Sequence, residues 1–231
     1  MNRVLPATRV HLITWPTLLA WPWGILLTSF VFNLVLFTGI GDDIEGGPQT
    51  GGLVSVYIVT MVSAGQSITQ FFPFSLGLSV TRRTFYAAVS LLLLGESLLF
   101  GVMLYLCKLV ERATDGWGIS MGFFAPSFLN SDNPVLQILI YMVPFLVLGF
   151  FGIFAALVMK RWGISGLYVL SISLLSLLGL PAVLITWQGW WLAVGRWFGD
   201  QSALTLFAGW PALLALLLAG AGLLTIRRAT T

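Results

Sequence analysis

Glu96 is the residue whose type and position most invite chemistry. It is the single charged residue inside the apolar run 84–106. A charged side chain at the centre of a membrane-spanning helix costs about 2.5–3.5 kcal/mol unless it is neutralised or paired. Its neighbours three and four positions away are Leu92, Leu93, Leu99 and Phe100. Because none of these can pair with a carboxylate, a partner must come from another segment.

Polar side chains recur near helical spacing in the preceding apolar run, 53–75, as Thr60, Ser63, Gln66, Ser67 and Gln70. The helical rise puts Gln66 within about 5 Å of Glu96 in depth. Two interpretations follow for the cluster of Ser63, Gln66, Gln70 and Glu96. It lines a substrate route on which Glu96 contacts protons or cations, or Glu96 is a neutral acid hydrogen-bonded to Gln66 or Gln70 that locks two helices together.

The chain has few other residues of the types that catalysis or metal binding requires. His11 is the single histidine and Cys107 the single cysteine, which excludes a histidine-pair zinc site, a thiol metal cluster and an intrachain disulfide. No Gly-Lys dipeptide occurs, so the chain has no phosphate-binding loop of the G-x-x-x-x-G-K-[ST] type. We therefore expect no catalytic residues, no metal site and no cofactor in this chain, which we predict is not an enzyme.

The composition indicates a membrane protein. The chain has 231 residues, of which 58% are hydrophobic and 8% charged, whereas soluble domains carry about 25% charged residues. A membrane span needs about 20 apolar residues. Six segments fit: 17–40, 53–75, 84–106, 134–159, 164–186 and 203–226. We predict an all-α polytopic fold with six transmembrane helices in one domain, residues 1–231.

The loop charges alternate along the chain. Segments without acidic residues contain Arg3, Arg9, Arg82, Arg83, Lys160, Arg161, Arg227 and Arg228. The intervening segments contain Asp42, Asp43, Glu45, Glu111, Asp115, Asp132 and Asp200, with Lys108, Arg112 and Arg196. Basic residues concentrate in cytoplasmic loops, so this pattern predicts that both termini are cytoplasmic.

Two segments outside the predicted spans are expected at the membrane surface. Residues 1–16 mix basic and apolar side chains and fit a short interfacial helix or a disordered basic tail. Residues 187–198 contain four tryptophans and fit a short re-entrant or surface hairpin. In the loop 108–133, the side chains of Trp117, Phe123, Phe124 and Phe128 are expected to rest on the outer interface.

The stretch FPFSLGLSVTRRTF, residues 72–85, forms a tight cationic connection between the second and third predicted spans. Together with six spans, cytoplasmic ends and the absence of an ATPase motif, it resembles the permease subunits of bacterial ABC-2-type transporters. The basic pair also has a simpler interpretation, that it only anchors the topology.

The resemblance implies a short coupling helix in this connection that docks on a separate cytosolic ATPase. The docking residues would be Gly77, Leu78, Ser79, Thr81, Arg82 and Arg83. The resemblance also implies an interfacial helix at residues 9–15, and a second permease copy, identical or related, faced by the second and fifth spans. ATP and Mg²⁺ would bind the partner, the protein would lie in the bacterial cytoplasmic membrane, and the substrate would be a lipophilic drug, peptide or lipid-like molecule.

Two other functions stay open. A proton- or ion-coupled carrier would use Glu96 as its coupling group and need no ATPase. A membrane scaffold without transport activity would leave the polar residues of the second span with a packing role alone.

Overall fold

The computed structural model describes residues 15–40, 47–77 and 79–227. Helices account for 86% of this part of the chain, which contains no strand. The predicted all-α class is therefore confirmed. The main helices are α2 (Trp15–Ile40), α3 (Val54–Gly77), α4 (Arg82–Ala113), α5 (Pro134–Gln188), α6 (Trp191–Asp200) and α7 (Trp210–Ile226). Short helical segments are η2 (Gly116–Ser120), η3 (Ser127–Leu129) and η4 (Thr205–Gly209).

Four helices of the described part are long and apolar enough to cross a membrane: Ala20–Gly39, Arg82–Ala113, Pro134–Gln188 and Thr205–Ile226. The prediction of a membrane-embedded helical protein agrees with this finding. Helix α3 covers the second predicted span but is not among the four, because Gln66 and Gln70 lower the hydropathy of its central turns.

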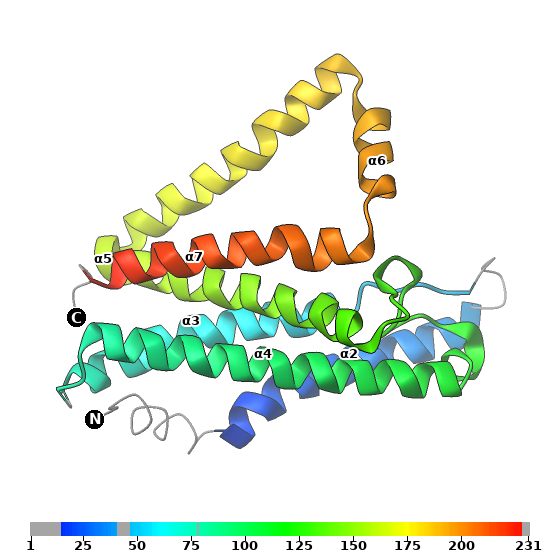
Figure 1. The fold of residues 1–231 in the computed structure, drawn as a ribbon, viewed down its shortest axis with the longest axis horizontal. Coiled ribbons are helices and arrows are strands. Elements are labelled where there is room, and N and C mark those ends of the chain that lie inside the picture. Colours follow the sequence, from blue (N-terminus) through cyan, green and yellow to red (C-terminus); the bar gives the residue numbers. More distant parts are fainter. Residues whose placement is uncertain (1–14, 41–46, 78, 228–231) are drawn as a thin grey trace.

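Helix α5 covers two predicted spans. Its 55 residues far exceed the roughly 20 that cross a bilayer. At Gly163 the backbone adopts φ 68° and ψ −160°, and the ribbon reverses direction there (Figure 1). Only glycine adopts this backbone region readily. We call residues 134–162 the near arm and residues 164–188 the far arm.

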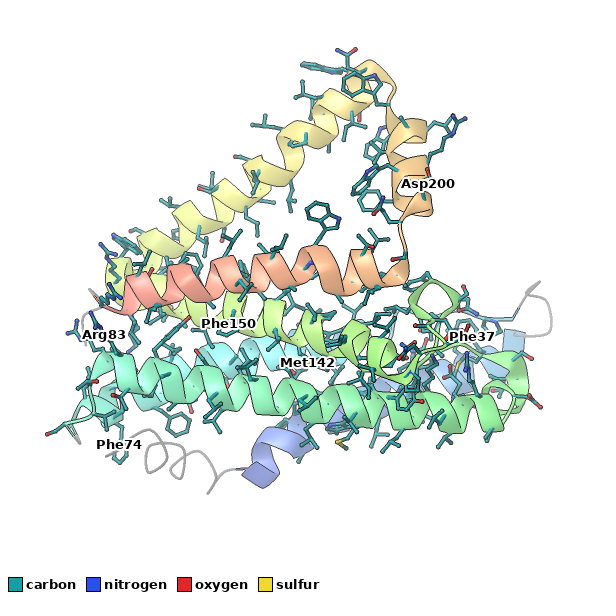
Figure 2. The ribbon with its side chains drawn as sticks, viewed as in Figure 1. Phe37, Phe74, Arg83, Met142, Phe150 and Asp200 are labelled. Carbon is teal, nitrogen blue, oxygen red and sulfur yellow. The ribbon has the colours of Figure 1, made fainter. Side chains whose placement is uncertain are left out.

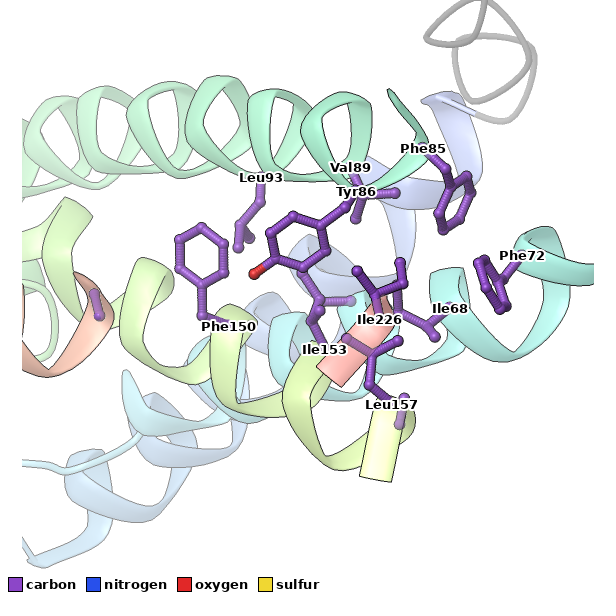
Figure 3. Packing of buried hydrophobic residues seen from close by; sticks show 13 residues of the cluster. Ile68, Phe72, Phe85, Tyr86, Val89, Leu93, Phe150, Ile153, Leu157 and Ile226 are labelled. Carbon is purple, nitrogen blue, oxygen red and sulfur yellow. The ribbon is translucent and has the colours of Figure 1, made fainter. Parts of the chain in front are cut away.

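The near arm is the centre of the bundle, in contact with α3, α4 and α7. Figure 3 shows the apolar core at one end of this bundle, formed by Ile68, Phe72, Phe85, Tyr86, Val89, Leu93, Phe150, Ile153, Leu157 and Ile226. A glycine lets α3 and α5 approach closely: a Cβ added at Gly152 would lie 2.1 Å from the carbonyl oxygen of Met61. The far arm leaves this bundle, and α6 leads back from its tip to α7 (Figure 1).

Among the described residues, one end of the bundle carries basic side chains alone, and the other carries most of the acidic ones. The α3–α4 turn, the α5 bend and the end of α7 meet at one end, which carries Arg82, Arg83, Lys160, Arg161 and Arg227 (Figures 1 and 2). The loop that follows α4, with Glu111, Asp115 and Asp132, lies at the other. We call these the basic end and the acidic end.

Two expectations about elements differ from the structure, and a third falls mostly on residues that the structure does not describe. Helix α3 continues through Pro73 to Gly77, and α4 begins at Arg82, so the described residues contain no separate coupling helix between them. Helix α4 extends to Ala113, seven residues beyond the predicted end. Most of the expected interfacial helix, residues 1–14, lies outside the described residues, and Trp15 already belongs to α2.

Candidate functional site

The polar residues of α3 line a groove on the surface of the bundle. This α2–α3 groove has a volume of about 560 Å³ and is lined by Trp21, Ile25, Ile58, Val59, Val62, Ser63, Gln66, Ser67, Gln70 and Phe71. Ser63 is half-buried, and Gln66 and Gln70 are exposed. The structure thus brings Ser63, Gln66 and Gln70 together on one face, as their helical spacing predicts.

This polar face points away from the core. The buried residues of α3 are Val56, Tyr57, Thr60, Ala64, Ile68 and Phe72, on the opposite side of the helix. Within the described part of the chain, the side-chain amides of Gln66 and Gln70 form no hydrogen bond. An amide exposed to hydrocarbon without a partner costs several kcal/mol. The face therefore requires water, a ligand or another protein surface.

A second groove borders Gln66 from the other side. It lies between α3 and α5, has a volume of about 280 Å³ and is otherwise mostly apolar, with Gly65, Phe151, Gly152, Ala155, Ala156 and Met159 in its walls. Leu167 of the far arm also lines it. Gln66 is thus the polar residue shared by both grooves, halfway along α3.

Glu96 does not join this cluster. Its side chain is half-buried on α4, and its buried Oε1 atom has no hydrogen-bond partner among the described residues. The expected pairing with Gln66 or Gln70 is therefore not formed. The expectation rested on equal depth in the membrane, which does not fix the direction of a side chain around its helix. The amides of Gln66 and Gln70 face the α2–α3 groove, whereas α4, which carries Glu96, packs mainly on α5.

Other polar atoms near Glu96 share its situation. Ser97 is fully buried, and the side-chain oxygens of Ser97 and Ser90 have no hydrogen-bond partner in the described part of the chain. The indole nitrogen of Trp23 is also unpaired. The Trp23 ring lies 5.9 Å from the ring of Phe100, one turn beyond Glu96. The middle of α4 thus carries several buried polar atoms that the described residues leave unsatisfied.

The predicted docking residues lie on a short turn at the basic end. Gly77 ends α3, Leu78 lies outside the described residues, and Ser79 has a φ of 59°. Thr81 caps α4, because its side-chain oxygen accepts a hydrogen bond from the backbone N–H of Thr84 at 3.2 Å.

The two arginines of this turn differ in their surroundings. Arg83 is exposed, whereas Arg82 is half-buried and donates from Nη1 to the carbonyl oxygen of Arg227 at 3.2 Å. The turn is thereby attached to the end of α7. The sequence placed both basic pairs on one side of the membrane but contained no signal for this contact.

The acidic end contains a buried carboxylate that the sequence did not predict. Glu111 is only 4% exposed. Its Oε2 accepts from the indole of Trp117 at 3.0 Å and from the backbone N–H groups of Phe123 and Phe124 at 3.1 and 2.8 Å. Its Oε1 accepts from the backbone N–H of Ala125 at 2.9 Å. These four donors compensate the burial of the charge and hold the loop against α4.

Lys108 fixes the later part of the same loop. It is 1% exposed and donates to Asn130 Oδ1 and Gln137 Oε1 at 2.6 Å each and to the carbonyl oxygen of Ser131 at 2.9 Å. The span predicted from the sequence ends at Leu106, which assigns Lys108 and Glu111 to the following loop. Their spacing of three residues on a continuing helix was the available signal.

Two of the four aromatic residues expected at the outer interface lie elsewhere, whereas Phe128 is exposed. Phe123 and Phe124 do not rest on the interface but are buried, at 0% and 2% exposure. They pack on Phe30 of α2 with ring centroids 5.2 and 5.6 Å away, and Trp117 lies 4.7 Å from the same ring. The hydrogen bonds to Glu111 pull this segment inward. The acidic end is therefore closed by a packed loop.

The described residues contain no group of three or more His, Cys, Asp or Glu side chains that could hold a metal ion. Cys107 is half-buried and free. Comparison with protein-family models, with curated proteins and with solved structures found no match.

Proposed function

We propose that this chain is the membrane-spanning permease subunit of an ATP-binding-cassette transporter of the ABC-2 type. It exports a lipophilic drug, peptide or lipid-like substrate, driven by a separate cytosolic ATPase that binds ATP and Mg²⁺. In this proposal the two arms of α5 and helices α2, α3, α4 and α7 form six spans, with both termini in the cytoplasm of a bacterium. A second permease copy, identical or related, completes the transporter.

One observation carries the proposal: α3 joins an unpaired polar face, on the bundle surface halfway along the helix, to a cationic turn at the basic end. Gln66 and Gln70 form no hydrogen bond among the described residues and line the α2–α3 groove. The same helix ends at Gly77, beside Arg82 and Arg83. Such a helix can transmit movement from a partner at the turn to a polar surface in the membrane.

The distance that this helix covers is short. Gly77 follows Gln66 by eleven positions, which is about 16 Å at the rise of an α-helix. The Thr81 cap and the bond from Arg82 to the Arg227 carbonyl connect the turn to α4 and α7. A rigid-body displacement of the turn by the ATPase would therefore shift α3 together with its neighbours and change which side of the membrane reaches the polar face.

The partner is tested by affinity purification of the tagged chain from its native membranes in mild detergent, followed by mass spectrometry. We expect a stoichiometric ATPase that contains a phosphate-binding loop. The double variant Arg82→Glu, Arg83→Glu should lose this partner, because the turn would then present two negative charges to the docking surface.

The matched control is Lys160→Glu, Arg161→Glu, which reverses another basic pair at the same end and should retain the ATPase. Protease accessibility of a C-terminal tag in intact cells verifies that both variants keep their orientation. Retention of the ATPase by the Arg82, Arg83 variant in its normal orientation would exclude this docking turn.

A second candidate, a proton- or ion-coupled carrier, is favoured by one observation. The buried Oε1 of Glu96 has no hydrogen-bond partner in the described residues, a common condition for ionisable groups that work inside membranes. In a carrier, Glu96→Gln would abolish transport and activity would follow the proton gradient. In the permease that we propose, activity follows ATP instead.

A further inference from the structure

An apolar groove separate from the polar face of α3 lies where the near arm, α6, η4 and α7 meet. Its volume is about 430 Å³, and it is lined by Pro144, Val147, Leu148, Trp197, Phe198, Leu206, Phe207, Trp210, Pro211 and Leu214. The indole N–H groups are the only polar side-chain atoms among these residues. Such a lining accommodates hydrocarbon and provides no anchor for a polar ligand.

The position of this α6 groove makes it accessible from the membrane. Helix α6 runs across the bundle direction, between the tip of the far arm and the start of α7, and Asp200 lies at its end (Figures 1 and 2). None of its residues is buried. A tryptophan-rich amphipathic helix in this orientation is typical of the headgroup level of a bilayer. The groove below it therefore opens toward the acyl chains of one leaflet.

Helix α6 also carries a cation, Arg196, that has no partner among the described residues. The two basic residues at the acidic end of the bundle both have internal partners. Lys108 donates to three acceptors, and Arg112 lies 3.7 Å from Asp132. Arg196 is exposed, and the described residues give it no hydrogen bond or ion pair, not even with Asp200 one turn away. It directly precedes Trp197 and Phe198 of the groove. A guanidinium in this position suits a phosphate.

We propose that the α6 groove binds one acyl chain of a phospholipid with an anionic headgroup, whose phosphate contacts Arg196. The chain occupies the apolar groove and the headgroup lies beside α6. The tryptophans of α6 keep the helix at the depth where both contacts form at once. This site does not depend on the transport proposal, because it uses neither the polar face of α3 nor the basic turn.

The site is tested with the full chain reconstituted in phosphatidylcholine nanodiscs. A small fraction of the lipid carries a photoreactive diazirine in its acyl chain, on either a phosphatidylglycerol or a phosphatidylcholine headgroup. Peptide mass spectrometry then locates the crosslinks. The far arm is the internal reference for bulk lipid, since Ile172, Leu175 and Leu178 are all more than 60% exposed and line none of the grooves described above.

We expect crosslinks at residues 144–148 and 206–214 to exceed those on the far arm. The phosphatidylglycerol probe should label the groove about fivefold more than the phosphatidylcholine probe, which is the effect of one basic residue at an anionic interface. Arg196→Gln should remove this preference. Leu214→Trp should fill the groove and lower its labelling, whereas the matched variant Leu217→Trp, on an exposed position of α7 outside the groove, should not.

Three results would each overturn the proposal: labelling of the groove no stronger than that of the far arm, equal labelling by both headgroups, or full labelling in Leu214→Trp. Unchanged labelling of the far arm shows that each variant is inserted, and unchanged labelling of the groove in Leu217→Trp shows that a tryptophan on α7 does not by itself disrupt the bundle.

Discussion

At the residue scale, the buried ionisable side chains of this chain fall into two groups, those with hydrogen-bond partners and one without. Glu111 and Lys108 are almost fully buried, and hydrogen bonds from or to the loop compensate both charges. Glu96 is half-buried and has no such bonds among the described residues. A compensated charge fixes structure, whereas an uncompensated one is available to a proton, a ligand or a partner.

The role of Glu111 leads to a stability prediction. In Glu111→Gln, one acceptor oxygen is replaced by an amide NH₂ that faces backbone N–H donors. We expect the free energy of unfolding to fall by about 3 kcal/mol and the Tm to fall by roughly 6–12 °C, measured by tryptophan fluorescence in detergent. The control is Asp115→Asn, an exposed position with a φ of 48° that asparagine tolerates. Equal Tm values for Glu111→Gln and the native chain would show that the network contributes little.

At the element scale, hydropathy and charge predicted most of the helices but not their relative rotation. Helices α2 and α3, the near arm, and η4 together with α7 coincide with predicted segments within a few residues. The predicted end of α4 is too early, because charged residues such as Lys108 and Glu111 are typical of a loop. The buried hydrogen-bond partners that keep them on the helix cannot be read from the sequence. The pairing of Gln66 with Glu96 failed because depth follows from residue number, whereas the facing direction depends on which helices are neighbours.

Close packing of α3 on the near arm gives a second prediction. In Gly152→Ala the new Cβ would lie 2.1 Å from the Met61 carbonyl oxygen, so the two backbones must separate. We expect a loss of about 1–3 kcal/mol in the free energy of unfolding, again followed by the Tm. The matched substitution Gly95→Ala on α4, where a Cβ meets nothing within 4 Å, should leave the Tm unchanged or raise it. A similar loss in both variants would refute the close contact as the cause.

At the scale of the whole molecule, a compact bundle carries one arm that leaves it. No side chain of the far arm is buried and most are exposed, such as Ile164 at 65% and Leu184 at 55%. The sequence predicted the far arm as a span of its own, but it gave no angle between the arms, because that angle depends on one backbone conformation at Gly163. The sequence likewise did not predict the α6 groove, because its walls come from four separate elements whose arrangement depends on this bend.

The bend at Gly163 provides a third prediction. Its φ of 68° and ψ of −160° are unfavourable for any residue with a Cβ, at a cost of about 1–3 kcal/mol. Gly163→Ala should therefore change the angle between the arms. Electron–electron distance measurements between spin labels at Leu136 and Leu184 should shift or broaden relative to the native chain. Gly179→Ala, at an open position within the far arm, should leave the distances unchanged, and identical distances in Gly163→Ala would show that the bend does not depend on glycine.

The central claim is that a separate ATPase drives this chain, and ATP hydrolysis by the tagged protein purified from its native membranes tests it most directly. The chain has no phosphate-binding loop of its own, so we assign to a partner any vanadate-sensitive hydrolysis that co-purifies with the native chain and is lost when the docking turn is changed. We predict such hydrolysis with the native chain, its loss in Arg82→Glu, Arg83→Glu and its retention in Lys160→Glu, Arg161→Glu. A folded, homogeneous chain that hydrolyses no more ATP than the Arg82, Arg83 variant would contradict the claim.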